Sequence, residues 1–244
     1  MKKILAMLLA LVMVLSLAAC ASTQPAAEPA ASSDAPAESG KTYTVGVCQL
    51  VQHEALDAAT QGFVDALKEA LGDAVTIDVQ NASGDSVNCG TIVNGFVAKG
   101  VDLIMANATG ALTAAAAATS DIPILGTSIT AYGVALDLDD FAGTVGGNIS
   151  GTSDLAPLDG QAAVLKELCP DAKVVGILYC SGEPNSKFQA DTITPMFEEL
   201  GLEVKEFTFA DSNDIASVVN NAIATSDVLY IPVSYTHLRA HETG

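Results

Sequence analysis

Apolar positions along the chain follow two periods that alternate. From residue 41 to residue 125, short continuous apolar runs predict buried strands, and segments with apolar residues every three to four positions predict helices. The expected strands are 43–50, 75–79, 101–106 and 122–125. The expected helices are 54–71, 86–99 and 112–118, and Gly72 and Gly100 follow the first two. This spacing indicates βαβ units, in which a parallel sheet is covered by helices on both faces.

The alternation stops at residues 128–152, which are rich in Gly, Thr and Asp and lack a long helical pattern. It then resumes, with expected helices at 159–168, 185–200 and 212–224 and expected strands at 174–179, 203–209 and 228–232. Pro195 is expected to kink the second of these helices. The predicted fold class is therefore α/β, with two lobes of parallel sheet flanked by helices. We place lobe 1 at 41–130, a crossover or hinge at 131–152, and an incomplete lobe 2 at 153–232.

The first twenty residues have the layout of a secretory signal peptide. Lys2 and Lys3 precede an apolar run that is too short and too lightly flanked for a membrane-spanning stop-transfer helix. The run ends in Leu-Ala-Ala-Cys, which resembles the lipobox of bacterial lipoproteins. That resemblance implies cleavage after residue 19 and lipidation of Cys20. Residues 20–40, rich in Ala, Pro, Ser and Glu, are expected to be a flexible tether. The predicted location is the extracytoplasmic face of the cell membrane, with a lipid anchor.

The strand and helix pattern does not continue into the last residues, 233–244. Residues 233–243 read Val-Ser-Tyr-Thr-His-Leu-Arg-Ala-His-Glu-Thr, which resembles the translation of a transposase end sequence used to prepare sequencing libraries. We therefore interpret 233–244 as a non-native, adapter-like tail and expect the natural sequence to continue after residue 232. His237 and His241 lie four residues apart, a spacing found in helical metal sites. The tail interpretation removes that suggestion, and no metal is expected.

The composition excludes several classes of function. The net charge of −19 repels phosphate backbones, so nucleic acid is not an expected partner. Cys48, Cys89, Cys169 and Cys180 include no Cys-x-x-Cys pair, and we interpret them as scattered buried thiols, although four cysteines allow three disulfide pairings. Motifs for dinucleotides, phosphates or a nucleophile with its base are absent from the sequence. We therefore expect neither enzymatic activity nor a cofactor; a surface enzyme whose catalytic pair lies in a missing C-terminal part is a third alternative.

In open parallel sheets, ligands bind outside the carboxyl ends of the strands. This rule selects polar residues in the loops after the expected strands. Hydroxyl groups, glycines and helix-start N–H groups suit a carboxylate, whereas Glu183 or Asp154 suits an ammonium group. The alternative for each Ser, Thr and Asn is plain helix capping, which is their commonest role. The candidate ligand-binding residues are Gln52, His53, Thr109, Gly110, Thr127, Ser128, Thr130, Asp154, Ser181, Glu183, Asn185 and Ser186.

Several segments match one known family in its own order. Two are fairly specific: Gln49-Leu-Val-Gln-His-Glu-Ala-Leu-Asp57, and Gly147-Asn-Ile-Ser-Gly-Thr-Ser-Asp154. Others are 81–85, 121–124, 173–185 and 227–232. The chain thereby resembles the substrate-binding family of ABC transporters that includes tryptophan- and tyrosine-binding lipoproteins. The resemblance implies a type I periplasmic-binding-protein fold, a ligand in the interlobe cleft, and no catalysis.

Two departures from the family pattern change the expected cleft. Thr130-Ala-Tyr132 stands where the family often has Thr-Asp-Pro, so one cleft carboxylate is absent. The tail stands where the family continues from Ile-Pro into Thr-Asp-Asn, which is a cleft loop. By resemblance we expect a solute-binding lipoprotein of an ABC importer that takes an amino-acid-like ligand, with tryptophan or tyrosine as the leading guess. Its partners would be a permease and an ATPase. The alternative is a lipoprotein that reports its ligand to a membrane receptor without transport.

Overall fold

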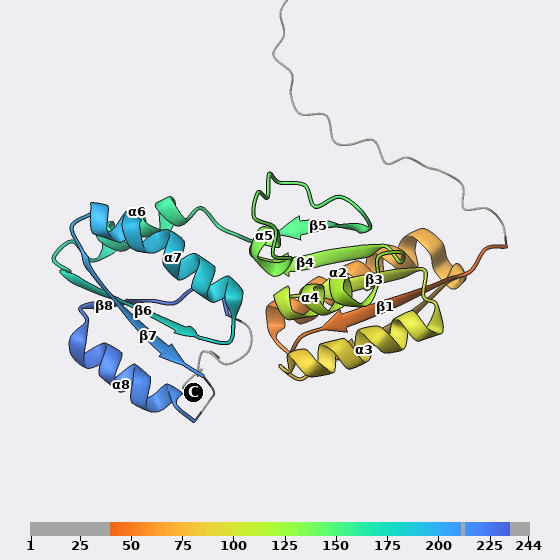
Figure 1. Ribbon diagram of the computed structural model, residues 1–244, viewed down its shortest axis with the longest axis horizontal. Coiled ribbons are helices and arrows are strands. Elements are labelled where there is room, and N and C mark those ends of the chain that lie inside the picture. The colour runs from red at the N-terminus through yellow and green to blue at the C-terminus, as the bar shows by residue number, and fades with distance from the viewer. Residues whose placement is uncertain (1–39, 211–212, 235–244) are drawn as a thin grey trace, which may run out of the picture. The chain divides into compact units, whose positions relative to one another are not determined.

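The computed structural model describes residues 40–210 and 213–234, which belong to one compact unit, 39–244 (Figure 1). The predicted signal peptide 1–19, lipidated Cys20, tether residues 20–39 and tail residues 235–244 lie outside the described residues. Within the described part, the strands form two parallel sheets. The predicted α/β class with helix-covered parallel sheets is therefore confirmed.

The first sheet has five strands in the order β2-β1-β3-β4-β5, all parallel to their neighbours. These strands are β1 Tyr43–Gln49, β2 Val75–Asn81, β3 Leu103–Asn107, β4 Ile124–Ile129 and β5 Ile149–Ser153. The helices are α2 Glu54–Leu71, α3 Ser86–Lys99, α4 Thr109–Ala118 and the short α5 Tyr132–Ala135, and a 3₁₀ turn spans Gly72–Ala74. In Figure 1, α3 and α4 lie on one face of this sheet and α2 lies on the other.

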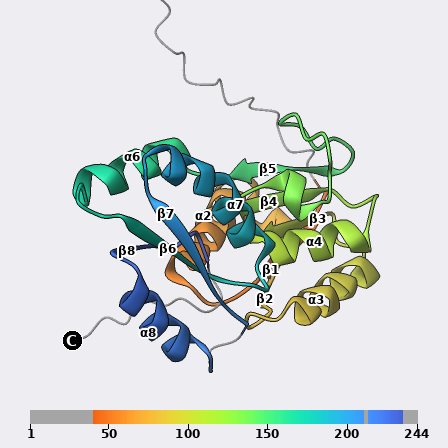
Figure 2. The ribbon, with the colours of Figure 1, turned by 60° about the vertical axis from the view of Figure 1, so that its left-hand side comes forward.

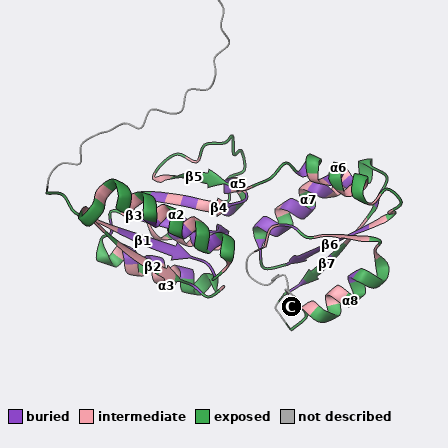
Figure 3. Ribbon diagram, turned by 180° about the vertical axis from the view of Figure 1, so that it is seen from behind, coloured by how far each residue is buried: buried purple, intermediate pink, exposed green. Residues whose placement is uncertain are grey.

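The interior of the first sheet explains its sequence pattern. Residues 45 to 51 are all buried, because helices cover both faces of β1 (Figure 3). The helix ends also follow from the sequence. Asp85 caps α3 by accepting a hydrogen bond from the Val87 N–H at 2.7 Å, and Gly100 ends the helix with φ of 65°. That left-handed conformation is the one that glycine adopts without strain at a helix end.

The second sheet has three strands in the order β7-β6-β8. The strands are β6 Val174–Cys180, β7 Glu203–Phe209 and β8 Val228–Tyr230, and the helices are α6 Leu158–Leu168, α7 Pro184–Glu199 and α8 Ile215–Thr225. Figures 1 and 2 show α8 on the opposite face of β6 from α6 and α7. Each face has its own core, because Ile177 and Tyr179 pack in the α6–α7 core and Leu178 and Cys180 pack in the α8 core.

The segment between the sheets differs from the prediction. The sequence predicts a crossover at 131–152, but β5 begins at Ile149 and pairs with β4, so it is a fifth strand of the first sheet. Gly146, Gly147 and Gly151 have φ values of 76°, 62° and 153°, and this glycine-rich composition concealed the strand signal. The α7 helix continues through Pro195 to Glu199, and the kink expected there stays a prediction.

Close packing of α3 on β1 gives a test of the first lobe. A Cβ added at Gly46 would lie 2.5 Å from two ring carbons of Phe96, which is fully buried. We expect Gly46→Ala to lower the free energy of unfolding by about 1–3 kcal/mol through overpacking. Gly62→Ala is the control, because a Cβ at this exposed site in α2 meets no atom within 4 Å. It should raise the free energy of unfolding by about 0.5–1 kcal/mol.

Urea denaturation of both variants measures the difference. Equal free energies for the two variants would contradict the packing described here.

Candidate ligand-binding site

A cavity of about 590 Å³ lies at the carboxyl ends of strands from both sheets. Leu50, Ala108 and Ala210 in its wall directly follow β1, β3 and β7, and Cys180 is the last residue of β6. Its volume falls in the range of small-molecule sites. Loops after parallel strands thus meet at this cavity, as the topology rule for such sheets predicts.

Three helices begin at the cavity wall. Gly84 and Ser86 lie at the start of α3, Thr109 and Gly110 open α4, and residues 183–185 open α7. The first N–H groups of a helix have no partner within the helix, and the helix dipole places partial positive charge there. The α4 helix has no side-chain cap, so its first N–H groups remain open to a ligand. The wall therefore favours a negatively charged group.

The start of α4 is held by a strained residue. Ala108 has φ of 85° and ψ of 160°, a region that is essentially restricted to glycine and costs about 1–3 kcal/mol for other residues. Its N–H donates to the carbonyl oxygen of Thr127 at 3.0 Å, which ties the loop to the end of β4. The carbonyl of Ala108 accepts from the N–H groups of Ala111 and Leu112, both at 3.1 Å. This conformation turns the chain sharply from β3 into α4.

Glu183 is the charged residue among the described residues of the wall. It is only 8% exposed and occupies the N-cap position of α7. The hydroxyl of Ser186 lies 2.9 Å from its Oε2 atom and donates to it. A buried carboxylate that is held in this way offers a fixed acceptor for a cation.

The first turn of α7 also holds the chain after β8. The Asn185 amide and the Ser186 hydroxyl donate to the carbonyl oxygen of Val233 at 3.1 and 2.9 Å, and the Val233 N–H donates to the Gln189 Oε1 at 3.3 Å. These contacts use only the backbone of residue 233, so they do not depend on its side chain. The interpretation of 233–244 as a non-native tail stays a prediction.

Ser186 has a single hydroxyl proton but two acceptors at 2.9 Å, Glu183 and the carbonyl of Val233. It can donate to one of them at a time. The position of the Val233 carbonyl after β8 therefore affects whether Glu183 receives the hydrogen bond from Ser186.

Four of the predicted site residues line the cavity: Thr109, Gly110, Glu183 and Asn185. Ser186 lies behind the wall, fully buried, and acts through Glu183. Ser181 is exposed, and its hydroxyl donates to the Phe209 carbonyl at 3.2 Å.

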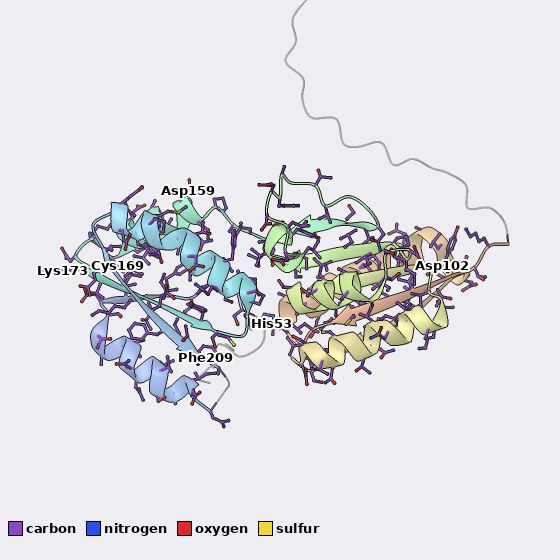
Figure 4. The ribbon with its side chains drawn as sticks, viewed as in Figure 1. His53, Asp102, Asp159, Cys169, Lys173 and Phe209 are labelled. Carbon is purple, nitrogen blue, oxygen red and sulfur yellow. The ribbon has the colours of Figure 1, made fainter. Side chains whose placement is uncertain are left out.

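The other predicted residues of the first lobe lie elsewhere. The N–H of Ala55 donates to the His53 Nδ1 at 3.2 Å, so His53 is the N-cap of α2, and Figure 4 shows it at the opposite end of the first sheet from Asp102. Gln52 borders a different, polar hollow that is also lined by Gln49 and Asp57.

The strand expected at 122–125 continues to Ile129, so Thr127 and Ser128 lie in β4 and not in a loop, and with Thr130 they hold the edge of the sheet instead of lining the cavity. Thr127 accepts from Ala108, Ser128 has φ of 56°, and the carbonyl of Thr130 accepts from the Ser153 hydroxyl at 3.0 Å. The Asp154 N–H donates to the carbonyl of Ile129 at 3.1 Å.

Tyr132 lies in the same edge region. Its hydroxyl lies 3.0 Å from the carbonyl oxygen of Gly126 and 3.2 Å from that of Thr152, so it links β4 to β5. Burial, and then the charge of Asp154, raise the pKa of Tyr132 to about 12. The phenol therefore remains protonated and can donate at any physiological pH.

Sequence reasoning missed the helix faces of the wall. Gly90 and Asn94 from α3 and Thr113, Ala114, Ala117 and Ala118 from α4 form this part of the cavity. The available signal was the spacing of small residues at 114, 117 and 118, which places them on one face of α4. Small side chains leave space beside a helix, but a sequence does not show whether that space is filled.

The described residues contain no group of three or more His, Cys, Asp or Glu side chains placed to hold a metal ion. No helix within 40–210 or 213–234 is long and apolar enough to cross a membrane.

Comparison with known proteins now identifies the family. A model of the ABC transporter substrate binding protein family matches residues 44–243. A curated relative, the tyrosine-binding protein of Clostridioides difficile (strain R20291), is 35% identical over 238 residues, or 95% of this chain and 67% of its own length. The chain belongs to this substrate-binding family.

Solved structures agree with this assignment. An ABC domain from Streptococcus pneumoniae in complex with L-Trp is 35% identical, with a TM-score of 0.75 over 80% of this chain and 67% of that one. A ligand-free, open substrate binding protein with adhesive properties from Clostridium difficile is 37% identical, with a TM-score of 0.57 over 78% and 65%. A leucine binding protein from Thermotoga maritima, at 17% identity and a TM-score of 0.61 over 78% and 55%, shares the fold. The chain thus has the type I periplasmic-binding fold and spans about two thirds of the length of its relatives.

The strain at Ala108 gives a test at the site itself. We expect Ala108→Gly to raise the free energy of unfolding by about 1 kcal/mol, because glycine adopts positive φ freely. The control is Ala111→Gly in the same buried turn of α4, which should lower it by about 1 kcal/mol or more. Chemical denaturation of both variants measures this contrast. A loss of stability in Ala108→Gly as large as that in Ala111→Gly would show that residue 108 is not strained.

Proposed function

We propose that this protein is an extracytoplasmic, lipid-anchored solute-binding protein of an ABC importer, and that it binds a free amino acid in the cavity. The observation that carries the proposal is the pairing, in one wall, of the uncapped α4 N-terminus with the buried Glu183 carboxylate. An α-amino acid carries a carboxylate and an ammonium group on the same carbon. The wall offers a partner for each.

The carboxylate is assigned to the start of α4. The N–H groups of Thr109 and Gly110 point out of the helix end, and the Thr109 hydroxyl is a further donor. A Cβ added at Gly110 would lie 3.3 Å from a Leu50 methyl carbon and 3.4 Å from the Ser86 hydroxyl, so close packing with these residues favours glycine at the start of α4. Such a site binds an anion without a basic side chain, and the described residues of the wall include neither Lys nor Arg.

The ammonium group is assigned to Glu183. Its carboxylate is the wall's negative charge, and Ser186 fixes its orientation through Oε2. A charge-assisted hydrogen bond in a site of this burial contributes about 1.5–3 kcal/mol.

The ligand side chain is assigned to the space beside α3 and α4. The cavity follows α4 from Thr109 to Ala118, a length of about 13 Å at 1.5 Å per residue. The wall there combines Gly90, Ala114, Ala117 and Ala118 with the polar Asn94 and Thr113, so it is wide and mainly formed by small residues. A large apolar side chain suits this space, and related proteins are described as a tyrosine-binding protein and as an L-Trp complex. We therefore propose an aromatic amino acid as the ligand.

The chemistry of the wall supports binding without catalysis. Cys180 is a thiol in the cavity wall, but burial raises the pKa of this thiol and so disfavours the reactive thiolate. We propose that the protein delivers its ligand unchanged to a permease and its ATPase, and that lipid on Cys20 keeps it at the membrane.

The test compares an amino acid with its deaminated analogue. Isothermal titration of the protein from residue 41 onward would use L-tryptophan, L-tyrosine, L-leucine and indole-3-propionate, which lacks the ammonium group. Glu183→Gln should weaken binding of the amino acid about tenfold or more and leave binding of indole-3-propionate little changed. Glu167→Gln, on the exposed surface of α6, is the control and should change neither.

Binding of indole-3-propionate as tight as that of L-tryptophan in the unsubstituted protein would overturn the assignment of Glu183. Absence of binding for all three amino acids would overturn the proposed function.

A further inference from the structure

Two cysteines from different elements share the core of the first lobe. Cys48 lies in β1 and Cys89 lies in the second turn of α3. Both are fully buried, and both belong to the core between the first sheet and its helices. Both are free thiols in the structure. They are separated by about 40 residues in sequence, so only the fold brings them together.

The packing of α3 on β1 explains why they meet. Gly46 and Cys48 are two residues apart in a strand and therefore face the same side of the sheet. Phe96 and Cys89 are seven residues apart in a helix, or two turns, and therefore share one face. The Phe96 ring sits directly on Gly46. Because α3 leads from β2 back to β3, it runs antiparallel to β1, and this places Cys89 over Cys48.

Both thiols therefore lie where α3 packs on β1, in one core and away from solvent. The side chain of Cys89, and then burial, raise the pKa of Cys48, as expected for two neighbouring thiols. A metal site would require further ligands, and the described residues contain no group of three that includes this pair.

We propose that Cys48 and Cys89 are a dithiol pair that forms an intramolecular disulfide bond and so cross-links β1 to α3. The oxidant is a low-molecular-weight disulfide. A protein thiolate attacks it and releases one reagent thiolate, which gives a mixed disulfide. The second cysteine loses its proton and displaces the other reagent thiolate. The two protons end on the two released thiols, two electrons pass to the reagent, and one protein S–S bond forms.

The structure indicates the order of these steps. Cys89 lies four residues into α3, and the end turns of helices open more readily than strands in the middle of a sheet. Cys48 lies in β1, which is paired on both sides. We therefore assign the first attack to Cys89 and the second to Cys48. Ser86 and Gly90 line the cavity on either side of Cys89, so the cross-link also fixes this part of the cavity wall.

The experiment maps the bond in the 244-residue chain. The folded protein is incubated with oxidised glutathione, quenched in acid, unfolded and alkylated, and its peptides are identified by mass spectrometry. We expect a cross-linked pair of peptides that contain residues 48 and 89, lighter by two hydrogen atoms than the reduced peptides and separated again by dithiothreitol. Cys169 and Cys180 should be alkylated, since they lie in the second lobe with no cysteine contact described.

Thermal unfolding gives a second readout. Closure of a loop of about 40 residues constrains the unfolded chain, so the melting temperature of the oxidised protein should rise by about 5–10 °C. Cys89→Ser should abolish both the cross-link and the shift, whereas Cys169→Ser should retain both.

Complete alkylation of residues 48 and 89 after oxidation would overturn the proposal, and so would a cross-link of either one to residue 169 or 180. The peptide map of the unsubstituted protein decides the matter even if a variant fails to fold. The result is independent of ligand binding, so it does not depend on the proposed function.

Discussion

The direction of the strands is the constraint on which the rest of the structure depends. All strands within a sheet are parallel, so every helix that follows a strand begins at the carboxyl edge. The positive ends of these helix dipoles therefore gather at one edge. In this protein α3, α4 and α7 begin at the wall of the same cavity. The wall consequently favours an anion although the whole chain carries a net charge of −19. A single buried carboxylate, Glu183, then makes the cavity complementary to a molecule that carries both charges.

Two residues at this edge have unusual local environments, Ala108 and Ser186. Ala108 stores strain where β3 turns into α4, which is common at sites where geometry is maintained at a cost in stability. The Ser186 hydroxyl instead has one proton and two possible acceptors, the Glu183 carboxylate and the Val233 carbonyl after β8. The strain at Ala108 lies at the start of α4, to which we assign the ligand carboxylate. The Ser186 hydroxyl lies beside Glu183, to which we assign the ammonium group, and it also contacts the chain after β8. Ala108 also belongs to the hydrophobic core of the first lobe, whereas Ser186 belongs to none of the three cores.

Much of the fold was predictable from the sequence, because local signals agreed with it. Helices α2 and α3 begin and end as predicted, since His53 and Asp85 cap their starts and Gly72 and Gly100 follow their ends. The site was predictable only where a loop leads directly from a strand into a helix at the cavity, as at Thr109, Gly110, Glu183 and Asn185. Loops after β1 and β4 carry similar residues, but these residues bind other partners, and local sequence does not distinguish the two cases. The β5 strand and the meeting of Cys48 with Cys89 depend on tertiary packing, which leaves no local pattern.

The most direct test of the central claim is a crystal structure of the protein with an aromatic amino acid bound. The account predicts that the ligand carboxylate lies within hydrogen-bonding distance of the Gly110 N–H at the start of α4. It also predicts that the ammonium group contacts Glu183 and that the side chain lies between α3 and α4. A ligand in the polar hollow beside Gln49 and Asp57, or one whose carboxylate is distant from α4, would contradict it.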